Sequence, residues 1–423
     1  MRRVVLAGMV GNGLEWYDFA LYGYFAPVIG KLFFPEYDHS IQLTATYGVF
    51  AAGFIMRPLG AMLFGYLGDR FGRKFSLILS ILMMAIPTGL IGLLPTYNSI
   101  GVAAPILLTF VRLLQGLSLA GQFSGSIAFI VEHAPIHRRG IAGSTTIMSL
   151  CAGMLLGSLT ATIFSASLSQ ASFESWGWRV PFMLGLVIAL VGFYIRHHTE
   201  ESPHYEQARD EGRLSKTPIT HAFQGHVMEL MRGIGMYMSV TVPFYTLTVF
   251  LNGFMLLSKS DGGLGLPDKD AYFISTVSMV LMMVMVPFTA HLTDICGRKR
   301  VLMWVSVAYF CSAFPIFFFM SYGGFLHAFI ADVAFAAIIA FYIGSVPALL
   351  VELFPTSVRY TGMSISYNVA AVIGGMTPMI ESWVVSRTHV DIVVALYSYI
   401  MLCAFVSFIS FIGYHDSYRE KLR

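Results

Sequence analysis

The decapeptide Gly65-Tyr-Leu-Gly-Asp-Arg-Phe-Gly-Arg-Lys74 and its counterpart Ala290-His-Leu-Thr-Asp-Ile-Cys-Gly-Arg-Lys299 decide the fold of this chain. Each lies between two long apolar stretches and places an acid, a glycine and a basic pair in the same order. A second matching pair follows, Glu132-His-Ala-Pro-Ile-His-Arg-Arg139 and Glu352-Leu-Phe-Pro-Thr-Ser-Val-Arg359, with the shared pattern E-x-x-P-x-x-x-R. The separations are 225 and 220 residues, so the sequence indicates an internal duplication.

The composition predicts a chain that lipid solvates. Of its 423 residues 56% are hydrophobic and 12% are charged, and the mean hydropathy is +0.71. A soluble domain carries about 25% charged residues, so this chain cannot cover itself with polar surface. No nucleotide-binding or hydrolase motif is present, which argues against an enzyme. The four cysteines lack a C-x-x-C pair and the histidines lack a ligand spacing, so we expect no metal site.

Apolar runs of about 20 residues are long enough to cross a bilayer as helices. The chain predicts twelve such spans: 4–31, 44–67, 75–94, 102–131, 141–166, 179–195, 234–257, 271–293, 301–320, 326–351, 361–386 and 391–413. We therefore expect an all-α integral membrane protein with two six-helix bundles, at 1–195 and 233–423, joined by a polar linker at 196–232. With the N-terminus inside, nineteen basic residues fall in cytoplasmic segments and five on the opposite face. This asymmetry predicts that both termini and the linker are cytoplasmic.

Ionisable side chains at membrane depth are costly and usually functional. Glu15 and Asp18 lie three residues apart and share one helical face. Arg57 lies at a similar depth in the second span. Arg112 and Gln115, with Gln122 further along, form a polar stripe on the fourth span.

Together these motifs resemble the major facilitator superfamily, whose signature after the second span is G-x-x-x-D-R-x-G-R-R/K. Further strings are similar to the metabolite:proton symporters, a family that includes proline/betaine, α-ketoglutarate, citrate and shikimate carriers. They are Gly11-Asn-Gly-Leu-Glu-Trp-Tyr-Asp-Phe19, Arg57-Pro-Leu-Gly60, Arg112-Leu-Leu-Gln-Gly116, Trp176-Gly-Trp-Arg-Val-Pro181, Arg196-His-His-Thr-Glu-Glu-Ser-Pro203 and Phe354-Pro-Thr-Ser-Val-Arg359. The chain departs from the family in its second decapeptide, at Ala290 and Ile295. It departs again at Gln122, where members usually carry a glutamate.

The resemblance implies proton-coupled symport of a small carboxylate-bearing solute by alternating access, either a proline/betaine-type osmolyte or an organic acid such as α-ketoglutarate. The proton motive force would drive it without a cofactor. The candidates for proton coupling are Glu15 and Asp18. The candidates for substrate binding are Arg112, Arg57, Gln115, Gln122, Tyr22, Tyr245 and Asn368. The candidates for a gate at the cytoplasmic membrane edge are Asp69, Arg70, Arg73, Asp294, Arg298, Glu132, Arg139, Glu352 and Arg359.

Alternatives remain open at the level of the sequence. Glu15 with Arg57 and Asp18 with Arg112 are also explained as ion pairs that only neutralise each other. An exporter has the same fold, and a membrane sensor that binds solute without moving it is a different class of function. We expect a monomer that spans the inner (cytoplasmic) membrane of the cell several times. Its expected partners are solute, protons and lipid, and no nucleic acid.

Overall fold

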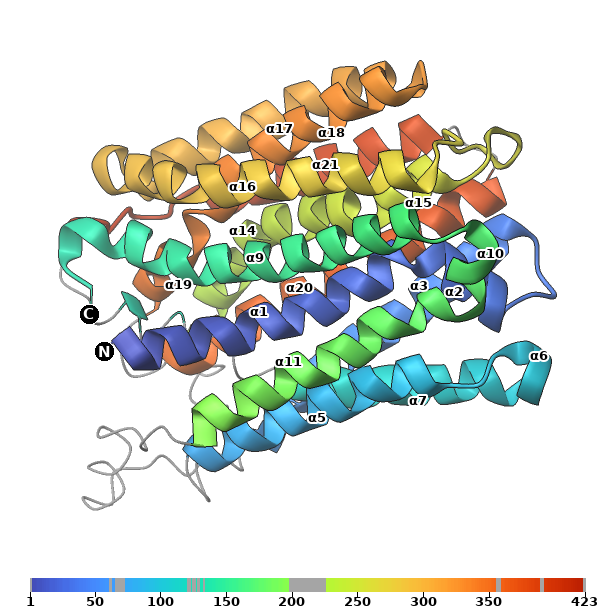
Figure 1. Cartoon of the computed structure of the whole chain (residues 1–423). Helices are drawn as coiled ribbons and strands as arrows, with labels where there is room; N and C mark the ends of the chain where they lie inside the picture. The colour runs from blue at the N-terminus through green and yellow to red at the C-terminus, as the bar shows by residue number, and fades with distance from the viewer. Residues whose placement is uncertain are drawn as a thin grey trace.

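The computed structural model describes residues 2–60, 63–64, 73–119, 123, 127, 130–131, 134–197, 226–354, 359–388 and 392–420. In these ranges the regular elements are helices, and the long ones run side by side along one direction (Figure 1). The first half of the chain forms α1 (Arg2–Tyr24), α2 (Ala26–Phe33), α3 (His39–Ile55), α5 (Arg73–Leu93), α6 (Tyr97–Ile100), α7 (Ala103–Ser118), η1 (Ile136–Arg138), α9 (Arg139–Ser167), α10 (Gln170–Ser172), η2 (Phe173–Gly177) and α11 (Arg179–His197). The second half forms α14 (Val227–Tyr245), η3 (Thr246–Phe250), α15 (Leu251–Leu256), η4 (Lys259–Asp261), α16 (Asp268–Cys296), α17 (Arg298–Ser321), α18 (Phe325–Ile343), α19 (Val346–Leu353), α20 (Arg359–Thr388) and α21 (Ile392–Ser410).

Seven helical segments of the described residues are long and apolar enough to cross a membrane, of the twelve spans that we expected. They are Ile136–Ser167, Val227–Leu256, Asp268–Cys296, Arg298–Ser321, Phe325–Leu353, Gly362–Val384 and Val393–Ser410. Two shorter apolar helices cover Ile78–Leu93 and Ala103–Ser118. Helices suit a bilayer because each helix satisfies its backbone hydrogen bonds internally, and lipid offers no partners for unpaired N–H and C=O groups.

The two ends of the chain mark one end of the molecule, on the left in Figure 1. The end of α11 that leads out of the first half lies there too, as does the start of α9. We call this end the terminal face. The opposite end, where α6, α10 and α15 lie, is the distal face.

Small residues let two pairs of equivalent helices approach closely. On α9, a Cβ added at Gly153 would overlap the carbonyl oxygen of Gly13 on α1. On α20, a Cβ added at Gly374 would overlap Thr241 of α14. Thr241 also donates a hydrogen bond to the carbonyl oxygen of Ala370, at 2.9 Å. The first half thus packs its fifth predicted span on its first, and the second half repeats this pairing, as close packing by small residues allows.

Helix boundaries differ from the sequence expectation around the linker. α14 begins at Val227, inside the predicted linker 196–232, and α11 continues to His197. The start of α14 fell in the predicted linker because it contains the charged residues Glu229 and Arg232. Both lie on the partly exposed side of α14, while Leu230 and Gly233 are buried. Charges on an outer face do not end a helix.

Candidate functional site

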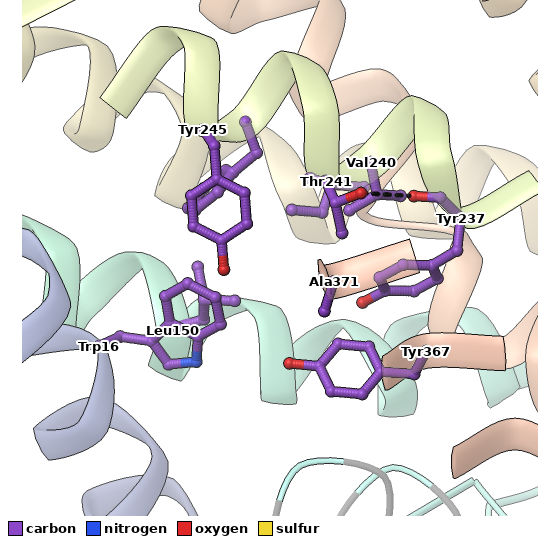
Figure 2. Close-up of a pocket in the computed structure, with 10 residues that line it drawn as sticks. Trp16, Leu150, Tyr237, Val240, Thr241, Tyr245, Tyr367 and Ala371 are labelled. Carbon is purple, nitrogen blue, oxygen red and sulfur yellow. Dashed lines mark hydrogen bonds between the residues drawn. The ribbon is translucent and has the colours of Figure 1, made fainter. Parts of the chain in front are cut away.

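A small cavity lies between helices of the two halves (Figure 2). Its lining residues are Trp16, Leu150, Tyr237, Val240, Thr241, Phe244, Tyr245, Ile343, Tyr367 and Ala371. In Figure 2, Tyr245 and Tyr367 direct their hydroxyl groups toward the space beside Trp16. The Trp16 and Tyr245 rings are stacked with centroids 6.2 Å apart, and Tyr237 meets Tyr367 edge to face at 5.3 Å. The walls are therefore aromatic on several sides.

Arg57 brings a positive charge to the edge of this cavity. Its Nη1 donates a hydrogen bond to the Tyr367 hydroxyl at 3.1 Å, and its guanidinium lies 4.4 Å from the centre of the Phe54 ring. The side chain is fully buried, and its Nε and Nη2 have no hydrogen-bond partner among the described residues. Glu15 acts electrostatically on Arg57 and on the tyrosines at 245 and 367. A buried guanidinium with unused donors is suited to a planar anion.

Asp18 belongs to a second polar cluster, contributed by α1, α5 and α7. Arg112 Nη1 lies 3.0 Å from Asp18 Oδ2 and 2.6 Å from Gln115 Oε1. Gln115 Nε2 donates to Asp18 Oδ2 and to the Thr88 hydroxyl, each at 2.9 Å. The Arg112 guanidinium lies 3.9 Å from the centre of the Tyr22 ring. All five side chains are at most 3% exposed, so the cluster is sealed from solvent.

The predicted substrate residues thus divide between two places. Tyr245 lines the cavity and Arg57 reaches it through Tyr367, whereas Arg112, Gln115 and Tyr22 surround Asp18 and do not line it. Asn368 follows Tyr367 on α20 and donates to the carbonyl oxygen of Ser364 at 2.8 Å. Gln122 lies outside the described residues.

The predicted gate residues of the second copy meet at the terminal face. Asp294, in the last turn of α16, accepts hydrogen bonds from the backbone N–H groups of Gly140 and Ile141, at 2.8 and 3.1 Å. It therefore caps α9, a helix of the other half. Arg298 Nη2 lies 2.7 Å from Asp294 Oδ1 and 3.3 Å from Glu352 Oε1.

Two further features close this cluster. Arg139 Nη1 lies 3.8 Å from Glu352 Oε1, so both halves contribute a cation to that carboxylate. Gly297, which alone separates α16 from α17, has a φ of 94°, a value that strongly favours glycine. This backbone conformation explains the glycine between the acid and the basic pair of the second decapeptide. Asp69, Arg70 and Glu132 of the first copy lie outside the described residues, as do the side chains of Arg73 and Arg359.

The segment after α21 lies against the same cluster. Asp416 Oδ2 accepts from the backbone N–H of Lys299 at 2.9 Å, and Arg139 donates to the carbonyl oxygen of Glu420 at 2.9 Å. Burial raises the pKa of the Asp416 carboxyl above its ordinary value, although the Lys299 N–H and the charge of Arg298 lower it. The C-terminal segment therefore bridges both halves.

Hydrogen bonds also join the halves near the distal face. The carbonyl oxygen of Tyr24 accepts from Asn252 Nδ2 at 3.3 Å and from the Tyr272 hydroxyl at 3.0 Å. The Tyr47 hydroxyl donates to the carbonyl oxygen of Val249 at 3.1 Å. The cavity therefore lies between two sets of contacts, one toward each face.

Comparison with known proteins identifies the family. The sugar (and other) transporter family matches residues 4–419. The chain belongs to this family, within the major facilitator superfamily. It is 31% identical to the proline/betaine transporter of Salmonella typhimurium, over all of this chain and 85% of that protein. It is 32% identical to the shikimate transporter of Escherichia coli, over 90% of this chain and 87% of that one.

The fold of this transporter is shared with a proton:xylose symporter of the major facilitator superfamily solved with 6-bromo-6-deoxy-D-glucose. The TM-score is 0.79 at 17% identity, over 99% of this chain and 97% of the other. The family match and the relatives show that the chain is a multi-pass membrane transporter and not an enzyme, as the sequence predicted.

Several cavity residues of the transporter were absent from the sequence-based prediction. Trp16 lies between the two predicted acids at 15 and 18 and was not named as a site residue. Tyr237, Thr241 and Phe244 follow the i, i+4, i+7 spacing of one helical face, which continues to Tyr245. That spacing was the available signal, but it is shared by every apolar helix face that packs on another helix.

Proposed function

We propose that this transporter is a proton-coupled symporter of a small zwitterionic solute of the proline/betaine type, and that the aromatic cavity is its binding site. The observation that carries the proposal is the pairing of aromatic walls with one buried arginine at their edge. A zwitterion has one carboxylate and one ammonium group, and the site offers one chemistry for each.

Arg57 would bind the carboxylate through its unused guanidinium donors. The faces of Trp16, Tyr245 and Tyr367 would bind the ammonium group, since the electron-rich face of an aromatic ring attracts a cation. A quaternary ammonium such as that of glycine betaine donates no hydrogen bonds, so ring faces suit it better than polar acceptors. The names of the relatives include proline and betaine, which agrees with this chemistry.

An organic acid is the second candidate for the substrate, because one relative is named a shikimate transporter. Among the described residues, the cavity lining itself contains no basic side chain, and Arg57 is the cation that contacts it. A solute with two or three carboxylates would need more positive charge than this. The site therefore favours the zwitterion over α-ketoglutarate or citrate.

Proton coupling is assigned to Asp18, with Glu15 as the neighbouring candidate on α1. In the present arrangement Asp18 is paired with Arg112 and accepts from Gln115. Protonation of Asp18 would remove the ion pair and leave Arg112 with Gln115 and the Tyr22 ring. Because Glu15 lies one turn away and acts on Arg57, a shift of α1 that follows protonation would reach the solute site.

Alternating access would follow from opening the two sets of contacts in turn. The basic residues of the chain assign the terminal face to the cytoplasm. Asp294, Arg298, Glu352 and Arg139 would then hold the cytoplasmic side closed, and the contacts of Tyr24 and Tyr47 the outer side. The same roles are proposed for Asp69, Arg70 and their neighbours in the first copy.

Uptake into proteoliposomes tests the function directly. Radiolabelled glycine betaine, proline, α-ketoglutarate and citrate would be compared with and without a protonophore. We expect accumulation of betaine or proline that the protonophore abolishes. Uptake of the organic acids alone would replace the zwitterion with the second candidate. Protonophore-sensitive loss of internal solute would identify an exporter, and binding without any flux would identify a sensor.

A matched pair of variants tests the binding site. Tyr245→Phe retains the ring and should bind betaine within about twofold of the native protein, whereas Tyr245→Leu removes the ring face. Loss of one desolvated cation–π contact of about 0.5–2 kcal/mol predicts a roughly 2- to 30-fold weaker affinity. Equal affinities for the Phe and Leu variants would exclude the aromatic cavity as the ammonium site.

A further inference from the structure

Glu381 of α20 is a buried acid that the proposed coupling mechanism does not use. It lies seven residues before the last residue of α20, Thr388, which places it about 10 Å below the distal end of that helix. Its side chain is 2% exposed. Oε1 accepts a hydrogen bond from the Thr246 hydroxyl at 2.8 Å, and Oε2 has no hydrogen-bond partner among the described residues.

No described side chain supplies a positive charge to this acid. Its titratable neighbours are Tyr47 from α3, with Tyr399 and Cys403 from α21. The junction of α14 and η3 contributes the neutral Thr246 hydroxyl. Among the described residues Glu381 forms no ion pair, unlike Asp18 with Arg112. An ionised carboxylate without a cation costs several kcal/mol in such a place, so the closed structure favours the neutral acid.

Contacts between the halves surround Glu381. The next residue, Ser382, shares a hydrogen bond of 2.6 Å with the Thr44 hydroxyl of α3. Tyr47, one turn along α3 from Thr44, donates to the carbonyl oxygen of Val249 in η3, the π-helical segment that begins at Thr246. Separation of α3 from α20 and η3 would break these bonds and admit water beside the carboxyl group.

We propose that Glu381 is a proton-binding site of the distal gate: it takes up a proton as the distal face closes and releases it to the same side as that face opens. It regulates closure and does not carry the coupled proton, which the proposed function assigns to Asp18. The ligand we assign is a proton, since the polar side-chain contact of Glu381 among the described residues is the single Thr246 hydroxyl.

The inference rests on the proposed transport function for one of its two tests. The exchange measurement uses Asp18→Asn protein, because the proposed coupling acid would itself make exchange depend on external pH. With internal pH fixed, lowering the external pH should slow solute exchange across these proteoliposomes, by up to about tenfold per pH unit for one linked proton. Glu381→Gln, Glu381→Asp and Ser382→Ala are each added to this background. Glu381→Gln preserves the shape and the acceptor for Thr246 but cannot ionise. We expect its exchange to be independent of external pH, and Glu381→Asp to restore the dependence.

Ser382→Ala is the matched control for a purely structural effect. It removes the Thr44 contact beside Glu381 but leaves the acid, so the exchange rate changes while its pH dependence remains. If Ser382→Ala loses the pH dependence as Glu381→Gln does, the effect is structural and the proposal is wrong. Unchanged pH dependence in Glu381→Gln also overturns it.

Infrared spectroscopy tests the protonation state without any solute. The native protein at neutral pH should show the C=O stretch of a buried carboxylic acid, and Glu381→Gln should lose that intensity. An identical band in both proteins overturns the inference whatever the transport result. If the native protein transports no solute but the infrared band depends on Glu381, the proposed transport function is wrong. The inference that Glu381 is protonated is then still supported.

Discussion

Replacing Asp294 with asparagine should weaken the closed terminal face. Asp294 accepts from two N–H groups at the start of α9 and pairs with Arg298, and both groups of the pair are at most 1% exposed. Asparagine keeps one acceptor oxygen but no charge. Loss of a carboxylate at a helix N-terminus costs about 0.3–1 kcal/mol, and up to about 2 in partly buried geometry.

The broken ion pair adds to that cost. Removing one partner of a buried ion pair typically destabilises a protein by about 3–5 kcal/mol. Arg298 still pairs with Glu352 at 3.3 Å after the substitution, so the destabilisation should be smaller than this. A combined weakening of about 2–3 kcal/mol shifts the equilibrium between closed and open terminal faces by roughly 30- to 150-fold. Solute affinity should remain close to native, because Asp294 is not part of the cavity lining.

Cysteine labelling measures this shift. Ser144 on α9 is fully buried, so Ser144→Cys should react slowly with an impermeant thiol reagent in inside-out vesicles, after serine replaces the exposed Cys296 and Cys311. Adding Asp294→Asn should accelerate labelling by a large factor. Asp270→Asn, the same change in the first turn of α16, is the control and should have no effect. Native labelling rates with Asp294→Asn would refute the gate assignment.

Three further experiments test the remaining assignments. Neutralising the coupling acid, by Asp18→Asn or Glu15→Gln, should abolish accumulation against a gradient and leave solute exchange intact; protonophore-sensitive accumulation in both variants would exclude these acids. Arg112→Ala should impair uptake more than Arg112→Lys, and restored solute affinity and uptake in Arg112→Ala with Asp18→Asn would show that Arg112 serves the ion pair and not the solute. Reporter fusions after Thr96 and after Gly212 should report opposite sides of the membrane, and a common side would contradict the predicted topology.

Much of the architecture could be predicted from the sequence, because a helix that crosses a membrane needs a minimum length and an apolar composition. Length and apolarity predicted the spans, and the repeated decapeptide predicted the duplication. The repeated decapeptide and the second repeated motif together predicted that Asp294, Arg298 and Glu352 belong to one gate, and these three side chains are in contact. The hydrogen bonds from the N–H groups of Gly140 and Ile141 to Asp294 were not predictable. Every residue except proline has a backbone N–H, so the sequence does not indicate which N–H a carboxylate will accept from.

The cavity was predicted less well. Tyr245 and Arg57 were named, but Arg112 and Gln115 were grouped with them although they lie in the Asp18 cluster. Spacing along one helix gives the face on which a residue lies, but not which neighbouring helix covers that face. Aromatic residues make up 14% of the chain, so the few that line a cavity cannot be separated from those that only pack.

The two halves of the duplicated chain have diverged in chemistry while keeping their packing. α1 carries the paired acid Asp18, and its counterpart α14 carries Tyr237, Thr241 and Tyr245 at the cavity. The proposed proton site and the proposed cation-binding wall lie on equivalent helices and would act on one solute, since both helices border the same cavity. A shift of α1 on protonation of Asp18 would reach the cavity directly, since Trp16 on α1 stacks on Tyr245 of α14. The proposed coupling between proton and solute would therefore require no long path through the protein, only a shift of one helix against its counterpart.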